Sequence, residues 1–163
     1  MNCMNWFVVK SEIKNHLKEK NVPFNNMIIV SACLAGINCK WNGKSSPCSK
    51  VIKLVKKGKA IPVCAEQLGG LTTPRMPAEQ RKVKVFRKDG VDVTAEFKKG
   101  AKEVLNIAKM YKCKKAILKS NSPSCGSGKI YDGAFSGKLI VGDGVLVKLL
   151  KKNNIKVYTE EEI

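Results

Sequence analysis

Residues 27–43 read M-I-I-V-S-A-C-L-A-G-I-N-C-K-W-N-G, and this stretch decides the fold because it joins a buried strand to a cysteine. The apolar run from Met27 to Val30 is typical of a buried strand, and it ends at Ser31. In open α/β sheets, ligands bind at the carboxyl ends of the parallel strands. The thiol of Cys33, two residues further on, is therefore predicted to face the ligand.

Two other predicted strands also lead to a cysteine. The apolar residues 60–63 run directly into Cys64, and the strand 116–118 leads through a serine-rich loop to Cys125. Parallel strands end at the same edge of a sheet, so their following loops lie together. We therefore expect Cys33, Cys64 and Cys125 to converge on one crevice.

Helical patterns separate these strands. We predict a helix that Ser45 or Ser46 caps, with Pro47 in its first turn, and a long helix that Thr94 caps. A last helix carries Leu146, Leu149 and Leu150 and precedes a closing strand over 155–158. The alternation of strands and helices predicts an α/β fold with three layers, Rossmann-like, in which helices cover both faces of a mainly parallel sheet.

A small hairpin is added to this sheet. Residues 83–86 and 91–93 alternate around the turn Lys88-Asp89-Gly90, which is typical of a hairpin. The preceding segment, residues 64–79, has no secondary-structure period and is predicted to be a long functional loop. Residues 27–163 are interpreted as a single domain, and residues 1–26 as an N-terminal extension with a short helix that Ser11 caps.

Composition and charge narrow the classes of function. Lysine and arginine number 31 against 13 acidic residues, and the formal net charge of +18 favours attraction to polyanions such as tRNA. Aromatic residues are not interleaved with the lysines, so solvated lysines on the surface are the other interpretation. No apolar run is long enough to cross a bilayer and no signal peptide is evident, so we expect a cytoplasmic protein without a membrane partner.

The seven cysteines favour metal binding or catalysis over disulfides, because the count is odd and a reducing cytosol keeps thiols free. No C-x-x-C spacing is present. The spacing alone leaves three interpretations open for the strand-end cysteines: a metal or cluster site, a nucleophilic or redox thiol, and inert packing. Cys48 and Cys113 fall at core positions.

Three long motifs resemble the thiouracil desulfidase family, long catalogued as a domain of unknown function. They read S-A-C-L-A-G-I-N-C, P-V-C-A-E-Q-L-G-G-L-T-T-P-R-M-P-A-E and S-P-S-C-G-S-G-K-I-Y-D-G-A-F-S-G, and the resemblance runs from Met27 to the C-terminus. It implies a [4Fe-4S] cluster with three cysteine ligands, Cys33, Cys64 and Cys125, and one open iron. Cys39 is then expected to be a loop thiol near the cluster rather than a fourth ligand.

The chain departs from the family pattern at several places, and none of them removes a cysteine. Cys-Ala-Glu replaces the usual Cys-Pro-Glu, Leu-Ala-Gly replaces Leu-Leu-Gly, and Trp-Asn-Gly replaces Tyr-Asp-Gly. Pro-Arg-Met-Pro stands where a second proline is common. We expect Trp41 to contact the substrate, so its replacement affects which thiolated compound fits.

The resemblance also suggests roles for polar side chains near these motifs. Glu66 is the expected general base, with Glu79 in reserve. Ser122 is expected to position the ring or donate a proton, with Ser124 in the same role, and the alternative is that such serines bond the loop backbone. Arg75 is expected to pair with a phosphate of the substrate or of tRNA.

The leading hypothesis is an enzyme that replaces C=S by C=O in a small thiolated pyrimidine, of thiouracil or thiouridine type, with release of sulfide and no net redox change. A second hypothesis is the same reaction on 4-thiouridine in tRNA, which the charge favours. A third is a non-enzymatic, zinc-held module that docks on RNA. A thiol redox protein is the weakest, since no C-x-x-C dithiol exists.

Overall fold

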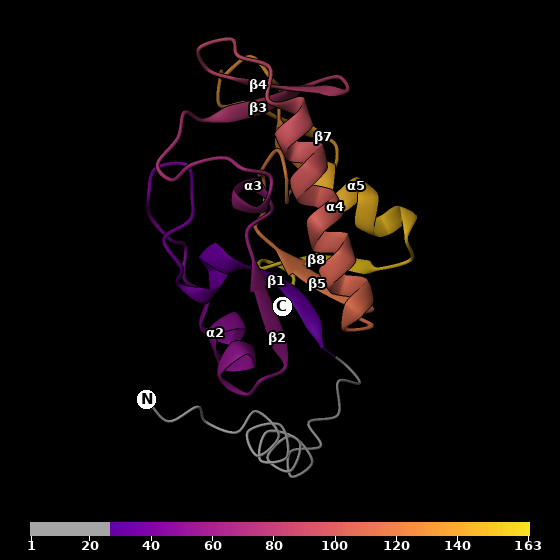
Figure 1. Ribbon diagram of the computed structural model, residues 1–163. Helices are drawn as coiled ribbons and strands as arrows, with labels where there is room; N and C mark the ends of the chain where they lie inside the picture. The colour runs from indigo at the N-terminus through magenta and orange to yellow at the C-terminus, as the bar shows by residue number, and fades with distance from the viewer. Residues whose placement is uncertain (1–26) are drawn as a thin grey trace, which may run out of the picture.

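A parallel sheet of four strands forms the centre of the computed structural model, which describes residues 27–163 (Figure 1). Its strands are β1 (Ile28–Ser31), β2 (Ala60–Val63), β5 (Lys115–Leu118) and β8 (Lys156–Thr159), in the spatial order β2-β1-β5-β8. Neighbouring strands all run parallel. The four strands predicted from apolar runs are confirmed to within one residue at each end.

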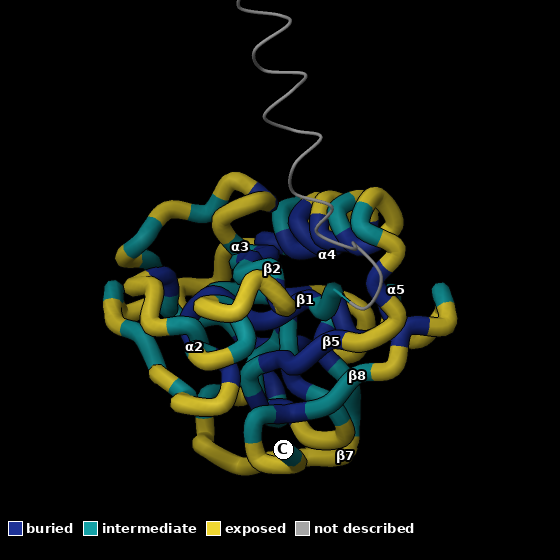
Figure 2. Tube along the Cα trace, turned by 90° about the horizontal axis from the view of Figure 1, so that it is seen from below, coloured by how far each residue is buried: buried dark blue, intermediate teal, exposed yellow. Residues whose placement is uncertain are grey.

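Helices cover both faces of this sheet (Figure 1). Helices α4 (Thr94–Met110) and α5 (Val145–Lys152) share a buried cluster with Ile29 of β1, whereas the short helix η1 (Ala32–Ala35) and α2 (Ser49–Lys56) pack with the next residue, Val30. Successive side chains of a strand point to opposite faces, so each strand feeds two cores. Figure 2 shows buried residues along the central strands and the inner sides of the helices. The predicted three-layer architecture is confirmed.

The strand order places a switch point beside β1. The chain passes from β1 to β2 on one side and then crosses to β5 on the other side of β1. In open α/β sheets the ligand crevice lies at the carboxyl ends of the strands where the order reverses. The register pairs Ser31 with Val63 and Val30 with Ile117, so the three strands end almost level with one another.

Two hairpins lie outside the sheet, and one corrects the prediction. Strand β4 (Lys84–Arg87) pairs antiparallel with the preceding β3 (Ala78–Arg81), not mainly with residues 91–93. Residues 91–93 return past the Lys88–Gly90 turn but make only an isolated bridge, Phe86 to Asp92. The tight turn at Lys82, whose φ is 57°, has no glycine or asparagine to announce it. The second hairpin, β6 (Lys129–Tyr131) with β7 (Leu139–Val141), was not predicted.

Two predicted helix starts are also corrected. Helix α2 begins after Cys48, not at Ser45 or Ser46, and no side chain caps it. The backbone N–H groups of Ser46 and Cys48 bond instead to carbonyls of η1, which keeps that segment extended. Thr94 is the first residue of α4 rather than its cap, and the Asp92 carboxylate accepts its N–H at 3.0 Å.

The segment predicted as one irregular loop contains a short helix, α3 (Ala65–Leu68), and the first two residues of β3. Helix α3 packs so closely on α4 that a Cβ atom added at Gly100 would lie 1.7 Å from the carbonyl oxygen of Ala65. This contact fixes the position of α3, which starts directly after Cys64.

The predicted N-terminal helix at Ser11 lies outside the described residues. Within residues 27–163, none of the helices combines the length and the apolar character that crossing a membrane requires.

Candidate active site

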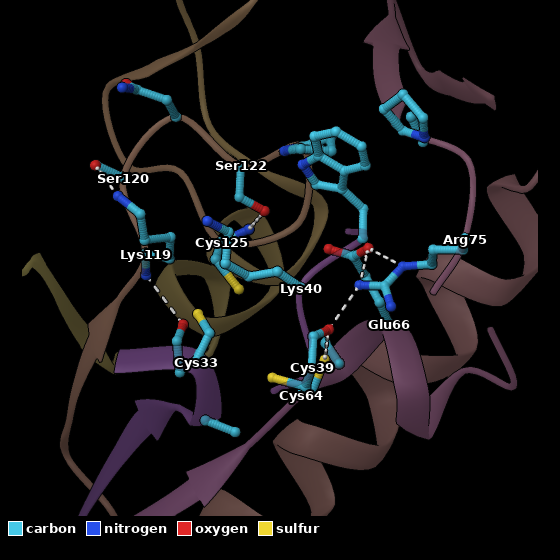
Figure 3. Close-up of a pocket in the computed structure, with 18 of the residues that line it drawn as sticks. Cys33, Cys39, Lys40, Cys64, Glu66, Arg75, Lys119, Ser120, Ser122 and Cys125 are labelled. Atoms are coloured by element: carbon cyan, nitrogen blue, oxygen red, sulfur yellow. Dashed lines mark hydrogen bonds and ion pairs between the residues drawn. The ribbon is translucent and has the colours of Figure 1, made fainter. Parts of the chain in front are cut away.

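A cavity of about 400 Å³ opens at the carboxyl ends of β1, β2 and β5 (Figure 3). Cys33 of η1, Cys64 at the start of α3 and Cys125 in the loop after β5 all line it. The fold thus brings three thiols that are far apart in the sequence to one crevice. The cavity also has carboxylate, cationic and aromatic groups in its wall, among them Lys40, Trp41, Glu66, Arg75, Glu79, Lys119 and Tyr131.

Burial and hydrogen bonding raise the pKa of two of these thiols. Desolvation raises the pKa of Cys125 to about 12, although a hydrogen bond from the Ser31 side chain acts in the opposite direction. A hydrogen bond with Cys39, followed by burial, raises the pKa of Cys64. The thiols of Cys64 and Cys125 are therefore protonated at neutral pH when no metal is bound, and binding of a metal centre must release their protons.

A fourth thiol, that of Cys39, lines the same cavity and is 2% exposed. It is in hydrogen-bonding contact with Cys33 and with Cys64, and the bond with Cys33, together with burial, raises the pKa of Cys39 to about 11. The Cys64 thiol also lies 3.8 Å from the carbonyl oxygen of Cys39. The loop thiol expected near the site is thus packed against two of the three predicted ligands.

The metal-binding donors that share this cavity are mainly thiols, which are the usual ligands of iron-sulfur clusters. In the described part of the chain, no three histidine, cysteine or acidic side chains come together closely enough to hold one metal ion. A structural zinc site needs all its ligand atoms about 2.3 Å from one point. In a four-iron cluster each thiolate binds a different iron, so its ligands surround a larger volume, and thiolates are its usual ligands.

Glu66 and Arg75 form an ion pair in the cavity wall. Arg75 Nε donates to Glu66 Oε2 at 2.8 Å, and Nη2 lies 2.7 Å from the same oxygen. The other donors of Arg75 reach the carbonyl oxygens of Thr72 and Cys39 and the hydroxyl of Thr73. All five guanidinium N–H groups are thereby engaged, so the structure does not support the expected contact of Arg75 with a phosphate. Glu66 Oε1 has no partner within residues 27–163.

Glu79, the reserve base, has a structural role. It lies on β3, is 8% exposed, and its Oε2 accepts the backbone N–H groups of Gly133 and Phe135, both at 2.9 Å. The carboxylate therefore ties the loop between β6 and β7 to β3. In both carboxylates of the cavity wall Oε1 has no hydrogen-bond partner within residues 27–163, and Glu66, whose side chain is 18% exposed, is the more accessible of the two.

The two predicted serines differ in position. Ser122 lines the cavity, and its Oγ accepts the N–H groups of Ser124 and Cys125, both at 3.1 Å, so it does bond the loop backbone. Ser124 is 1% exposed and does not line the cavity, and its Oγ has no hydrogen-bond partner in the described chain. Trp41 lines the cavity edge and is 47% exposed, which leaves its ring accessible to a ligand.

Sequence reasoning missed several groups in the cavity wall. Lys119 Nζ donates to Ser120 Oγ at 2.8 Å and forms an ion pair with Glu160. Burial favours a raised pKa for Glu160, but hydrogen bonds from Lys119 and from the Ser120 N–H outweigh it and lower that pKa. Lys40 also lines the cavity. Nothing in a chain with 31 basic residues distinguished these two lysines from the rest.

Comparisons with known proteins agree with this architecture. The chain is 45% identical over 147 residues to the uncharacterized protein YbbK of Bacillus subtilis (strain 168), covering 84% of this chain and 97% of that protein. The solved structure of TudS, described as a [4Fe-4S]-dependent thiouracil desulfidase, matches with a TM-score of 0.82 at 40% identity. That match covers 85% of this chain and 93% of TudS.

The family model described as 2-thiouracil desulfurase matches residues 28–162. That range includes the whole sheet, both layers of helices and every residue of the cavity wall. The chain therefore belongs to the 2-thiouracil desulfurase family.

Proposed function

We propose that this protein removes sulfur from a small thiolated pyrimidine. Water replaces the sulfur, so that C=S and H₂O become C=O and H₂S without net oxidation or reduction. The observation that supports this most directly is the shared cavity of Cys33, Cys64, Cys125 and Glu66 in a chain of this family. The similarity to a [4Fe-4S]-dependent thiouracil desulfidase supports the same cofactor here.

Cys33, Cys64 and Cys125 would hold the cluster. When bound, a [4Fe-4S] cluster with three protein ligands supplies one iron with an open coordination position, which acts as a Lewis acid on the substrate sulfur. Cys33 is buried, Cys64 and Cys125 are partly buried, and the Ser122 hydroxyl holds the loop that carries Cys125. Cys39 remains a thiol beside the site.

Glu66 is the proposed general base. Its Oε2 is bound twice by Arg75, which fixes the carboxylate, while Oε1 is left to accept a proton from the attacking water. Arg75 is thus a positioning residue, because it orients Glu66 and also binds the carbonyl of Cys39. Trp41 offers an aromatic face against which a pyrimidine ring can stack.

The size of the cavity favours a free base or nucleoside. About 400 Å³ lies near the lower end of the range for ligand pockets, roughly 300–1,000 Å³, and the cluster occupies part of it. The net charge of +18 favours tRNA as the alternative substrate. Arg75, the residue expected to bind its phosphate, is engaged within the protein.

The test begins with protein purified without oxygen. Iron and sulfide are quantified, and sulfide release and the desulfurated product are measured with 2-thiouracil, 4-thiouracil, 4-thiouridine and thiolated tRNA. We expect about four irons per chain and turnover of a free base or nucleoside. Turnover of tRNA alone would transfer the proposal to tRNA, and a colourless protein with one zinc and no turnover would contradict it.

Substitutions test the individual residues. Cys33→Ser, Cys64→Ser and Cys125→Ser are expected to lose the cluster, whereas Cys48→Ser, at a cysteine outside the cavity, retains it. With iron content unchanged, Glu66→Gln is expected to lower turnover by about 10²-fold or more. Full turnover by that variant would exclude Glu66 as the base.

A further inference from the structure

The charged groups of the cavity wall are almost all engaged within the protein. Arg75 binds Glu66, Lys119 binds Glu160, and Glu79 accepts two backbone N–H groups. Lys40 differs from the other cations of the wall, because residues 27–163 provide no hydrogen-bond or ion-pair partner for its ammonium group. The cavity therefore has one positive charge available for a ligand.

The backbone around Lys40 is held firmly. The carbonyl oxygens of the residues on either side, Cys39 and Trp41, accept bonds from the Arg75 side chain at 3.1 Å and from the Arg75 backbone N–H at 2.8 Å. The Lys40 N–H and carbonyl close a turn with Lys44 and Gly43. Lys40 is half-buried, so it is not a mobile surface lysine.

Its place in the cavity is central. In Figure 3, Lys40 lies between Cys125 on one side and Glu66 with Arg75 on the other. It lines the same cavity as a proposed cluster ligand, Cys125, and the proposed base, Glu66. A ring that occupies the cavity between the cysteines and Glu66 has the Lys40 side chain in the same wall.

We propose that Lys40 is a catalytic residue that neutralises the negative charge which develops on the pyrimidine ring during desulfuration. This inference rests on the proposed function. The oxygen of water forms a bond to the carbon that bears sulfur, Glu66 takes the proton, and the electron pair of C=S moves onto sulfur. Glu66 then returns this proton to sulfur and takes the proton of the new hydroxyl group as C=O forms. Sulfur leaves as hydrosulfide, so one water is consumed and HS⁻ and H⁺ are released.

A fixed cation in the cavity wall stabilises the negative charge that forms when water adds to the substrate ring. Addition of hydroxide to a neutral ring makes the ring anionic until hydrosulfide leaves. A positive charge already in place stabilises that anion without reorganisation, and removal of one such group typically lowers turnover by about 10²–10³-fold. The Glu66 carboxylate has its charge balanced by Arg75, so Lys40 remains available to the ring.

The experiment compares Lys40→Gln and Lys40→Arg with Lys44→Gln. Lys44 lies in the same turn, but it is exposed and does not line the cavity. Iron content and the visible spectrum are matched first. We then measure kcat and KM, and the binding of two unreactive rings of equal size: uracil, which is neutral at pH 7, and barbiturate, which is an anion.

We expect Lys40→Gln to lower kcat by about 10²-fold or more, and to weaken the binding of barbiturate far more than that of uracil. Lys40→Arg is expected to keep the preference for barbiturate, and Lys44→Gln to behave as the wild type. If Lys40→Gln weakens the binding of uracil and barbiturate equally, or leaves kcat unchanged, the inference is overturned while the proposed function stands. A wild-type protein that is loaded with iron but turns over no thiolated pyrimidine contradicts the proposed function itself.

Discussion

For the variant Gly100→Ala, helix propensity alone predicts a gain in stability, whereas the tertiary structure predicts a loss. Gly100 lies inside α4, and replacing a glycine by alanine within a helix ordinarily stabilises it by about 1 kcal/mol. In this fold, however, the new Cβ would lie 1.7 Å from the carbonyl oxygen of Ala65 and 3.0 Å from the backbone N of Gly69. Both atoms belong to backbone, which cannot rotate away as a side chain does.

The size of the effect follows from that overlap. To reach 3.0 Å, the closest contact that Cβ atoms make, α3 and α4 must separate by about 1.3 Å at this point. Overpacking of this kind costs about 1–3 kcal/mol, and the gain in helix propensity offsets about 1 kcal/mol of it. We expect a net loss of stability of up to about 2 kcal/mol.

The displacement also reaches the active site. Helix α3 begins directly after Cys64 and carries Glu66, so it moves a proposed cluster ligand and the proposed base together. Misplacement of a catalytic group by about 1 Å typically lowers turnover by about 10²-fold. Gly100→Ala is therefore expected to retain less iron and to lose most of its turnover.

Three measurements test this reasoning. Urea unfolding of the cluster-free protein gives the change in stability, and iron content and turnover of the loaded protein give the effect on the site. Lys99→Ala, at the exposed neighbouring position of the same helix, is the control and is expected to be near neutral. A Gly100→Ala protein that is more stable than the wild type and keeps its iron and turnover would refute the argument.

Two other predictions concern ion pairs and pH. Arg75→Met leaves the Glu66 carboxylate unpaired in a wall where the two side chains are 8% and 18% exposed, and it is expected to cost about 3 kcal/mol in urea unfolding. Adding Glu66→Gln to Arg75→Met should recover part of that loss, and strictly additive effects would contradict the pairing. The second concerns Asp92, where hydrogen bonds from the side chain and then the backbone of Thr94 lower the pKa from 3.8 to about 2. Its stabilising effect is therefore full above pH 3.8 and is lost as the pH falls through about 2, so the stability gap between wild type and Asp92→Asn should close over that interval. A gap that is constant from pH 7 to pH 2 would show that the charge of Asp92 does not matter.

Several features of the fold followed from local patterns in the sequence. The apolar runs at 27–30, 60–63 and 116–118 predicted three parallel strands because burial of both faces requires continuous apolar residues. The cysteines after these strands then shared a cavity, since parallel strands end at one edge of the sheet. Where a turn lacked its usual residues, as at Lys82, the prediction paired the wrong strands.

The sequence by itself therefore determined the layers of the fold, the strand ends that carry the cysteines, and the family, because each depends on residues that are close in the chain. Only the tertiary structure decided that Arg75 binds Glu66, that Cys39 touches two other thiols, and that Lys40, without a partner in residues 27–163, lines the cavity. Those facts depend on which side chains the crossover from β2 to β5 brings within a few ångströms of one another. No local pattern contains that information, because the partners come from separate elements of the fold.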